Sequence, residues 1–231
     1  MGARASTTGI LLLQARPDAP ASHCRPIIRS YTSLFPLSGW HFYLFLMLTT
    51  LDATTALVLI DLQHGTTSGE LAHPLADVAG RAARLLRAFR QAGRPVVIVS
   101  VNPTNSTQSK IRTQAPGVPA QLPPGFEDLL PEITEQPTDI RIHKPGWNAF
   151  YGTPLHDELR KRGITGLVLA GVSTSIGVEG TARAAAERGY NITLATDALT
   201  DRVAAAHDNS LRYIFPRLGE LGTTEEVLAL V

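Results

Sequence analysis

The first candidate for chemistry is an aspartate that ends a strongly apolar run. Asp61 follows the five residues "ALVLI", so its carboxylate is expected at the end of a buried apolar strand. In such surroundings the pKa of a carboxyl group rises unless a cation lies near it. Lys144, at the end of a later strand-like stretch, is an available cation. A buried carboxyl beside a lysine is suited to proton transfer. An aspartate after a strand also serves as a turn or helix cap, and both interpretations stay open.

The second candidate is the stretch "GVSTSIGVEGTARAAAERGY" (171–190), whose first half is typical of an active-site turn that opens a helix. The position where a nucleophile is expected holds Gly177. The hydroxyls of Ser173, Thr174 and Ser175 are possible substitutes, but no histidine base stands beside them in the sequence. We therefore do not expect a hydroxyl nucleophile here.

Further candidates stand close behind the predicted strands. Gln63 and Asn102 follow the first two strands and are expected to face the pocket. Trp147 and Phe150 follow Lys144, and they either wall the pocket or pack in the core.

These residues need a framework that brings them together. Short apolar runs predict strands over residues 55–63, 94–102, 139–145, 166–172 and 191–199. Amphipathic stretches predict helices over 74–93, 153–163, 178–189 and 203–219, and residues 226–231 are a last helical turn or short strand. Residues 103–133 are rich in Pro, Gly and Thr and are expected to form a long loop or lid.

This alternation predicts an α/β, Rossmann-like, three-layer fold with helices on both faces of a mainly parallel sheet of about six strands. Ligands of such sheets bind beyond the carboxyl ends of the strands. Asp61, Lys144 and Gly177 are therefore expected to share one rim.

Composition excludes several classes of function. The net charge is only +1 and no run of Lys or Arg forms a stripe, so we expect no nucleic-acid partner. Cys24 is the single cysteine and precedes the first predicted strand, which excludes disulfide frameworks, Cys-rich zinc sites and a thiol nucleophile inside the domain.

The first 46 residues differ from the rest, and we expect two segments: a leader over 1–46 and a globular domain over 47–231. The run "LFPLSGWHFYLFLML" is short for a membrane span and is interrupted by Pro36, Gly39 and His41. The leader is expected to be disordered, and it is a signal core, a transit segment or the product of a start codon placed upstream of Met47. We expect a cytoplasmic domain with no membrane contact, while the leader leaves export or organelle targeting open.

Three blocks carry a resemblance to a known family. "ALVLIDLQHG", "HKPGWNAFYGTPLHDELRKRGITGLVLAGV" and "STSIGVEGTARAAAERGYNITLATDALTD" are similar to the isochorismatase-like hydrolases in order and spacing, from Ala56 to the C-terminus. The resemblance implies a Rossmann-like parallel sheet, an Asp–Lys pair formed by Asp61 and Lys144, and a cis peptide at Val172–Ser173. In most members it also implies a nucleophilic cysteine, at the position that aligns with Gly177.

The glycine separates two branches of that family. Amidohydrolase members such as nicotinamidases attack a carbonyl with the thiolate, which glycine cannot replace. Isochorismatases proper also carry glycine here and hydrolyse a vinyl ether, which needs a proton donor and a water. By this resemblance Gly177 removes the nucleophile and makes room for a bulky substrate, Asp61 is the acid, and Lys144 holds Asp61 and stabilises charge.

The resemblance thus implies a hydrolase of a small polar cyclic molecule, for example a vinyl ether such as isochorismate. The alternative is an inactive or binding pseudoenzyme derived from a nicotinamidase-like cysteine amidohydrolase. Backbone N–H groups near 175–178 are expected to bind a substrate oxygen. The substrate-binding candidates are Gln63, Asn102, Trp147, Phe150, Val172, Ser173, Ser175 and Ile176.

Departures from the family leave the substrate open, since "SIGV" replaces an "HIGC"-like segment and His64 and Gly65 replace aromatic residues. Nicotinamidase-type metal ligands have no counterpart in "NPTNSTQSK", so we expect no metal and no organic cofactor. We expect a homodimer or homotetramer.

Overall fold

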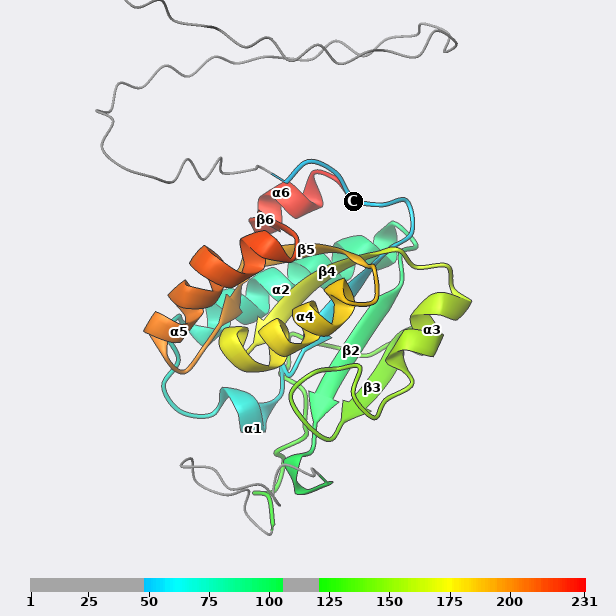
Figure 1. Cartoon of the computed structure of the whole chain (residues 1–231). Helices are drawn as coiled ribbons and strands as arrows, with labels where there is room; N and C mark the ends of the chain where they lie inside the picture. The colour runs from blue at the N-terminus through cyan, green and yellow to red at the C-terminus, as the bar shows by residue number, and fades with distance from the viewer. Residues whose placement is uncertain (1–47, 106–120) are drawn as a thin grey trace, which may run out of the picture. The chain divides into compact units, whose positions relative to one another are not determined.

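The computed structural model describes residues 48–105 and 121–231, and the predicted leader lies outside the described residues (Figure 1). Six parallel strands form one sheet in the order β3-β2-β1-β4-β5-β6. The strands are β1 (Thr55–Ile60), β2 (Val96–Val101), β3 (Ile140–Lys144), β4 (Gly166–Val172), β5 (Asn191–Thr200) and β6 (Glu220–Gly222). The helices are α1 (His64–Thr67), α2 (Leu75–Gln91), α3 (Leu155–Lys161), α4 (Glu179–Ala186), α5 (Ala204–Asn209) and α6 (Thr224–Leu228).

Alternate residues of the central strand face two separate cores. Ala56, Val58 and Ile60 pack with α3 and α4, whereas Leu57 and Leu59 pack with α2 and α6. Because both faces of β1 are buried, its sequence is continuously apolar, as expected for a strand in a covered parallel sheet. Figure 1 shows α4 in front of the sheet and α2 behind it. The predicted three-layer α/β fold is confirmed.

The strand order reverses between β1 and β4, which is where ligands of open α/β sheets bind. Gly171 permits the close approach of these two strands, since its φ is +131° and a Cβ there would lie 2.0 Å from the carbonyl oxygen of Ile60. The end of β4 is therefore seated directly against the end of β1.

The C-terminal part differs from the sequence-based expectation. The single helix expected over 203–219 is divided into α5, a π-helical turn (Ser210–Ile214) and a 3-10 turn (Phe215–Arg217) that contains Pro216. Proline lacks the N–H that a continuous helix needs. β6 was not predicted. Of the two alternatives for residues 226–231, the helical turn is confirmed, since Glu226–Leu228 belong to α6.

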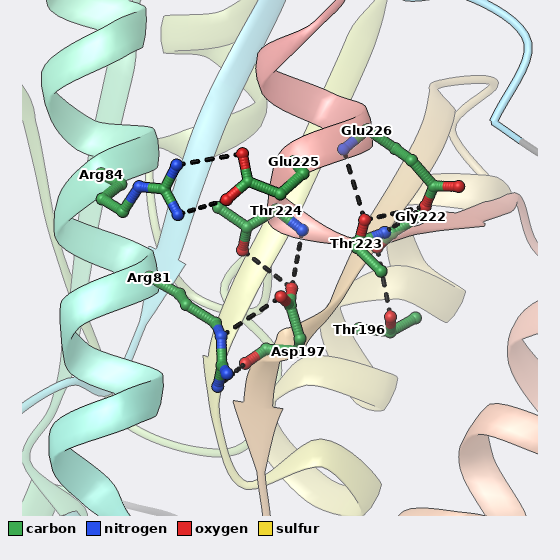
Figure 2. Close-up of polar contacts among 9 residues, drawn as sticks. All are labelled: Arg81, Arg84, Thr196, Asp197, Gly222, Thr223, Thr224, Glu225 and Glu226. Atoms are coloured by element: carbon green, nitrogen blue, oxygen red, sulfur yellow. Dashed lines mark hydrogen bonds and ion pairs between the residues drawn. The ribbon is translucent and has the colours of Figure 1, made fainter.

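A bulge in β5 connects this C-terminal part to the sheet. Leu194 pairs with Leu169 and Leu199 with Gly171, so four residues of β5 stand opposite Ala170. Asp197 in the bulge accepts hydrogen bonds from the N–H (2.7 Å) and hydroxyl (2.8 Å) of Thr224 at the start of α6, as Figure 2 shows.

Two arginines of α2 complete the network in Figure 2. Arg81 lies 3.2 Å from the Asp197 carboxylate, and Arg84 pairs with Glu225. Thr223 and Glu226 form a reciprocal capping box at the start of α6. These contacts fix α6 against α2 and β5.

No helix within residues 48–105 and 121–231 combines the length and the apolar composition of a membrane span.

Candidate active site

Asp61 occupies the end of β1 in an unusual backbone conformation. Its φ is +53°, and it is the one non-glycine residue with positive φ in the described part of the chain. Aspartate tolerates this left-handed region better than most residues, and such conformations cluster at functional sites. The hydroxyl of Thr66 donates to the Asp61 carbonyl oxygen at 2.5 Å, and the Asp61 N–H donates to Val99. These two bonds hold the Asp61 backbone in its left-handed conformation at the end of β1.

Lys144 meets that carboxylate from the end of β3. Its Nζ lies 2.7 Å from Oδ2 of Asp61 and donates to the carbonyl oxygen of Gly146 at 2.8 Å. Strand alternation buries Lys144 and leaves the neighbouring His143 exposed. The expected Asp61–Lys144 pair is thus present, with both side chains buried.

The two oxygens of the Asp61 carboxyl group differ. Oδ2 is paired with Lys144, whereas Oδ1 is buried without a hydrogen-bond partner among the described residues. Burial raises the pKa of Asp61 to about 6, and Lys144 opposes this rise. A buried polar atom without a partner is costly and calls for an explanation, and a bound substrate would supply one.

The turn after β4 brings Gly177 to the same carboxylate. A cis peptide joins Val172 to Ser173, as expected, and a π-helical turn (Thr174–Val178) leads into α4. A Cβ at Gly177 would lie 3.1 Å from Oδ2 of Asp61 and 3.3 Å from the carbonyl oxygen of Val172. A side chain at this position would thus be in tight contact with protein atoms, and the expectation that glycine makes room for a bulky substrate stays a prediction.

The N–H groups of this turn are mostly used within the protein. The N–H of Ser175 donates to Asp201 at 2.7 Å, and those of Ile176 and Val178 donate to the carbonyl oxygen of Ser173. The N–H groups of Ser175, Ile176 and Val178 are therefore not free to bind a substrate oxygen in this arrangement, and for the N–H of Gly177 the expectation stays a prediction. Asp201, a buried residue that sequence reasoning missed, caps the turn instead.

A second missed contact holds the same turn from the side of α5. The hydroxyl of Thr174 donates to the Thr200 carbonyl oxygen at 2.9 Å, so the Nδ1 of His207, at 2.8 Å, must donate to Thr174. Burial and the nearby His73 lower the pKa of His207. The turn is thus fixed by the segment that follows β5.

Gln63 was predicted to bind substrate, but the structure places its amide among backbone groups. The amide NH₂ donates to the carbonyl oxygens of Val101 (3.0 Å) and Phe126 (3.1 Å), and the amide oxygen accepts from the Val101 N–H (2.8 Å). Gln63 is fully buried. It fastens the segment around Phe126 to the end of β2.

We call residues 126–130 the cover, because they bond to residues 62–65 after β1. Gly65 permits the cover to approach, since a Cβ at this position would lie 2.1 Å from the Phe126 ring. The described part of the predicted 103–133 loop thus lies across the residues that follow β1. Residues 106–120 of that loop lie outside the described residues.

The remaining candidates fall into different surroundings. Asn102 donates to Glu127 at 2.6 Å and accepts from Thr104, at the edge of a hollow that Phe126 also lines. Phe150 is buried and stacks on Tyr190, so it packs in the core and does not wall a pocket.

Three further candidates lie on the segments that carry Lys144 and Gly177. Trp147 and Ile176 are exposed, with 59% and 42% of their surfaces accessible, so both side chains are free to meet a ligand. Val172 is fully buried. A role for it is confined to its backbone.

Taken together, the rim offers a carboxyl group suited to proton transfer, a buried ammonium group and a turn without a nucleophile beside them. Among the residues that the structure describes, no three His, Cys, Asp or Glu side chains gather as a metal-binding group.

Comparison with known proteins agrees with this geometry. The isochorismatase domain family matches residues 55–226. The uncharacterized isochorismatase family protein YecD of Escherichia coli O157:H7 is 40% identical over 180 residues, which cover 76% of this chain and 95% of that protein. The ureidoacrylate amidohydrolase RutB of Methylobacterium radiotolerans is 35% identical over 60% of this chain and 64% of its own length.

Solved structures lead to the same family. An isochorismatase family protein from Burkholderia thailandensis has a TM-score of 0.74 at 38% identity and covers 78% of this chain and 97% of its own. N-carbamoylsarcosine amidase from Thermoplasma acidophilum has a TM-score of 0.60 at 28% identity, over 74% of this chain and 97% of its own. The chain belongs to the isochorismatase family of hydrolases.

Proposed function

We propose that this hydrolase cleaves a small polar cyclic molecule without a cysteine nucleophile, and that Asp61 is its general acid. The observation that carries the proposal is Oδ1 of Asp61, which is buried, has no partner among the described residues and lies on a carboxyl group whose pKa is raised to about 6. A protonated carboxyl group at that position can deliver its proton to a substrate at near-neutral pH.

Hydrolysis of a vinyl ether such as isochorismate fits these groups. Asp61 transfers its proton to the terminal carbon of the enol ether, and the resulting cation is attacked by water. The adduct then loses the ring alcohol as its C–O bond breaks, the enol ether becomes a ketone, and the proton released from water returns to Asp61. One water is consumed, and no covalent bond to the protein is needed at Gly177.

Lys144 has two tasks in this scheme. Its ammonium group holds Oδ2, which orients Oδ1 toward the substrate, and it stabilises the carboxylate that forms when the proton leaves. Trp147 and Ile176 supply apolar contact surface to the substrate.

Amide hydrolysis is the second candidate, because the names of two relatives describe amide cleavage, ureidoacrylate amidohydrolase and N-carbamoylsarcosine amidase. In this scheme Asp61, in its ionised form, would activate a water in place of the missing thiolate. A pseudoenzyme that only binds its ligand is the third outcome.

A turnover screen distinguishes these outcomes. Isochorismate and simple enol ethers form one panel, and ureidoacrylate, N-carbamoylsarcosine and small amides form the other. We expect turnover in the enol-ether panel, and a loss of about 10²- to 10⁴-fold in Asp61→Asn with the fold retained. Turnover of amides alone would reject the vinyl-ether proposal, and activity of Asp61→Asn within tenfold of the wild type would reject Asp61 as the acid. Ligand binding without turnover in either panel would indicate the pseudoenzyme.

A further inference from the structure

Thr181, in the first turn of α4, contacts both the loop that follows Lys144 and the turn that holds Gly177. Its hydroxyl donates to the carbonyl oxygen of Gly177 at 2.7 Å. The hydroxyl oxygen of Thr181 also accepts a hydrogen bond from the N–H of Ala149, with 3.0 Å between the nitrogen and the oxygen. Thr181 and Ala149 are both fully buried.

The first of these bonds is ordinary for a threonine in a helix, where the hydroxyl often bonds the carbonyl four residues earlier. The second bond is not explained in this way, because Ala149 belongs to the loop between β3 and α3. A Cβ at Gly180 would lie 3.5 Å from Asn148, so this loop is in direct contact with α4. Thr181 is therefore the polar link between that loop and the Gly177 turn.

The contacts form a closed ring around the acid. Asp61 binds Lys144, Lys144 donates to Gly146, and the loop runs from Gly146 to Ala149. Ala149 donates to Thr181, Thr181 donates to Gly177, and Gly177 faces Oδ2 of Asp61. Every link in this ring is a hydrogen bond, an ion pair, a short stretch of backbone or a close packing contact.

We infer that Thr181 is a positioning residue, which sets the distance between Asp61 and Lys144 by tying the lysine's loop to the Gly177 turn. The inference deepens the proposed function, since it names a further residue of the same site. A hydroxyl with one donor and one acceptor contact is required, because the Ala149 N–H and the Gly177 carbonyl are of opposite polarity. Serine can make both bonds, and valine, which has the same shape, can make neither.

The test reads the Asp61 carboxyl group directly in the full-length protein. Aspartate labelled with ¹³C at Cγ is titrated by NMR, and the Asp61 signal is identified by its absence in Asp61→Asn. Lys144 is the charged group that lowers the pKa of this carboxyl, while burial raises it. In Thr181→Val we expect the titration midpoint to rise, because the carboxyl stays buried while the lysine is held less firmly. In Thr181→Ser it should match the wild type.

A matched control is available on the other side of the sheet. Thr224 is equally buried and its hydroxyl donates to Asp197 at 2.8 Å, so Thr224→Val also removes a buried hydroxyl bond. Its thermal midpoint should fall, while the Asp61 titration should not move. If Thr181→Val lowers the thermal midpoint and leaves the Asp61 titration unchanged, Thr181 is only structural and the inference is overturned.

A measurement on the wild type decides the question if Thr181→Val does not fold. The amide signal of Ala149 should shift with the same midpoint as the Asp61 carboxyl, and that of Thr224 should not. An Ala149 amide whose chemical shift does not change as Asp61 titrates would overturn the inference.

A second experiment, steady-state kinetics, depends on the proposed function. With a substrate found in the screen, Thr181→Val should lower kcat by about 10- to 100-fold with KM little changed, as expected when reacting groups are misplaced. A wild-type protein that turns over nothing would remove the proposed function, and the titrations would still decide the role of Thr181.

Discussion

A side chain at residue 177 would meet the Asp61 carboxylate directly, since its Cβ would lie 3.1 Å from Oδ2 of Asp61. Gly177 is therefore a packing partner of the carboxylate in addition to the place of the missing nucleophile. This relationship makes the substitution of Gly177 informative for two reasons, the volume of a Cβ and the chemistry of a thiol.

Gly177→Ala and Gly177→Cys separate these two effects. Both variants press a Cβ against Asp61, so both should lose turnover of an enol ether. Only the cysteine adds a thiol, at the start of a helix and beside Lys144, where the pKa of a thiol is lowered. Steady-state rates on the enol-ether and amide panels provide the measurement. Amide turnover gained by Gly177→Cys, absent from Gly177→Ala and unaccompanied by loss of native activity, would defeat the vinyl-ether proposal.

The raised pKa of Asp61 predicts a pH dependence of stability. The carboxyl titrates near 3.8 when unperturbed and near 6 in the folded protein. Between these values the folded state holds a proton that the unfolded state has lost, so this group's contribution to the free energy of unfolding decreases as pH rises from about 4 to about 6. The total is on the order of 3 kcal/mol for about two pKa units.

Urea unfolding at a series of pH values tests this prediction. Relative to Asp61→Asn, the wild type should lose stability as pH rises through that window, and the difference should be constant at higher pH. Glu187→Gln, which changes an exposed carboxyl, is the control and should follow the wild type. A wild type and an Asp61→Asn variant with parallel curves would show that Asp61 titrates normally.

Much of the fold was predictable because buried strands have recognisable patterns of apolar residues. The continuous apolar residues of β1 and the alternation of β3, which ends on Lys144, gave the correct strands and placed Asp61 and Lys144 at one rim. β6 was not predictable in this way, because three residues, Glu220–Gly222, carry no apolar pattern. A usable signal for α6 was present in the spacing of Thr223 and Glu226, which is that of a capping box.

Site residues were predictable where they follow directly after a strand. They were not predictable where their role depends on a contact with the backbone of a distant segment. Gln63 follows β1 as expected, yet its role depends on Phe126, which lies in a segment without strand periodicity. Asp201 also follows a predicted strand, so the strand-end reasoning could have included it. The bond from Ala149 to Thr181 has no sequence signal, because it joins a loop to the buried face of a helix.

Gln63→Ala should loosen the cover that it fastens. The variant removes three hydrogen bonds to backbone groups of Val101 and Phe126, leaving buried donors and acceptors unpaired. We expect faster hydrogen exchange at the amides of Gly65 and Leu130, which bond across the cover. Gln91→Ala, at an exposed position on α2, is the control. Unchanged exchange in Gln63→Ala would show that Phe126 is held by packing alone.

Asp197→Ala should destabilise the attachment of α6. The carboxylate accepts two hydrogen bonds from Thr224 and pairs with Arg81 (Figure 2), so its loss should cost about 1–3 kcal/mol in urea unfolding. Glu225→Gln weakens only the exposed pair with Arg84 and should leave the unfolding midpoint nearly unchanged. Equal effects of the two variants would show that the cap on Thr224 contributes nothing.

The bulge in β5 divides one strand into two segments with independent alignment. Its first part, from Asn191 to Leu194, follows the lower half of β4, and its last two residues, Leu199 and Thr200, pair again beside the rim. Between these two parts, residues 195–198 leave β4 and serve the C-terminal segment instead, since Ala195 pairs with Gly222 of β6 and Asp197 caps Thr224 of α6. One strand therefore links two regions of the molecule, because its middle holds the C-terminal helix and its last residues pair with β4 beside the candidate site.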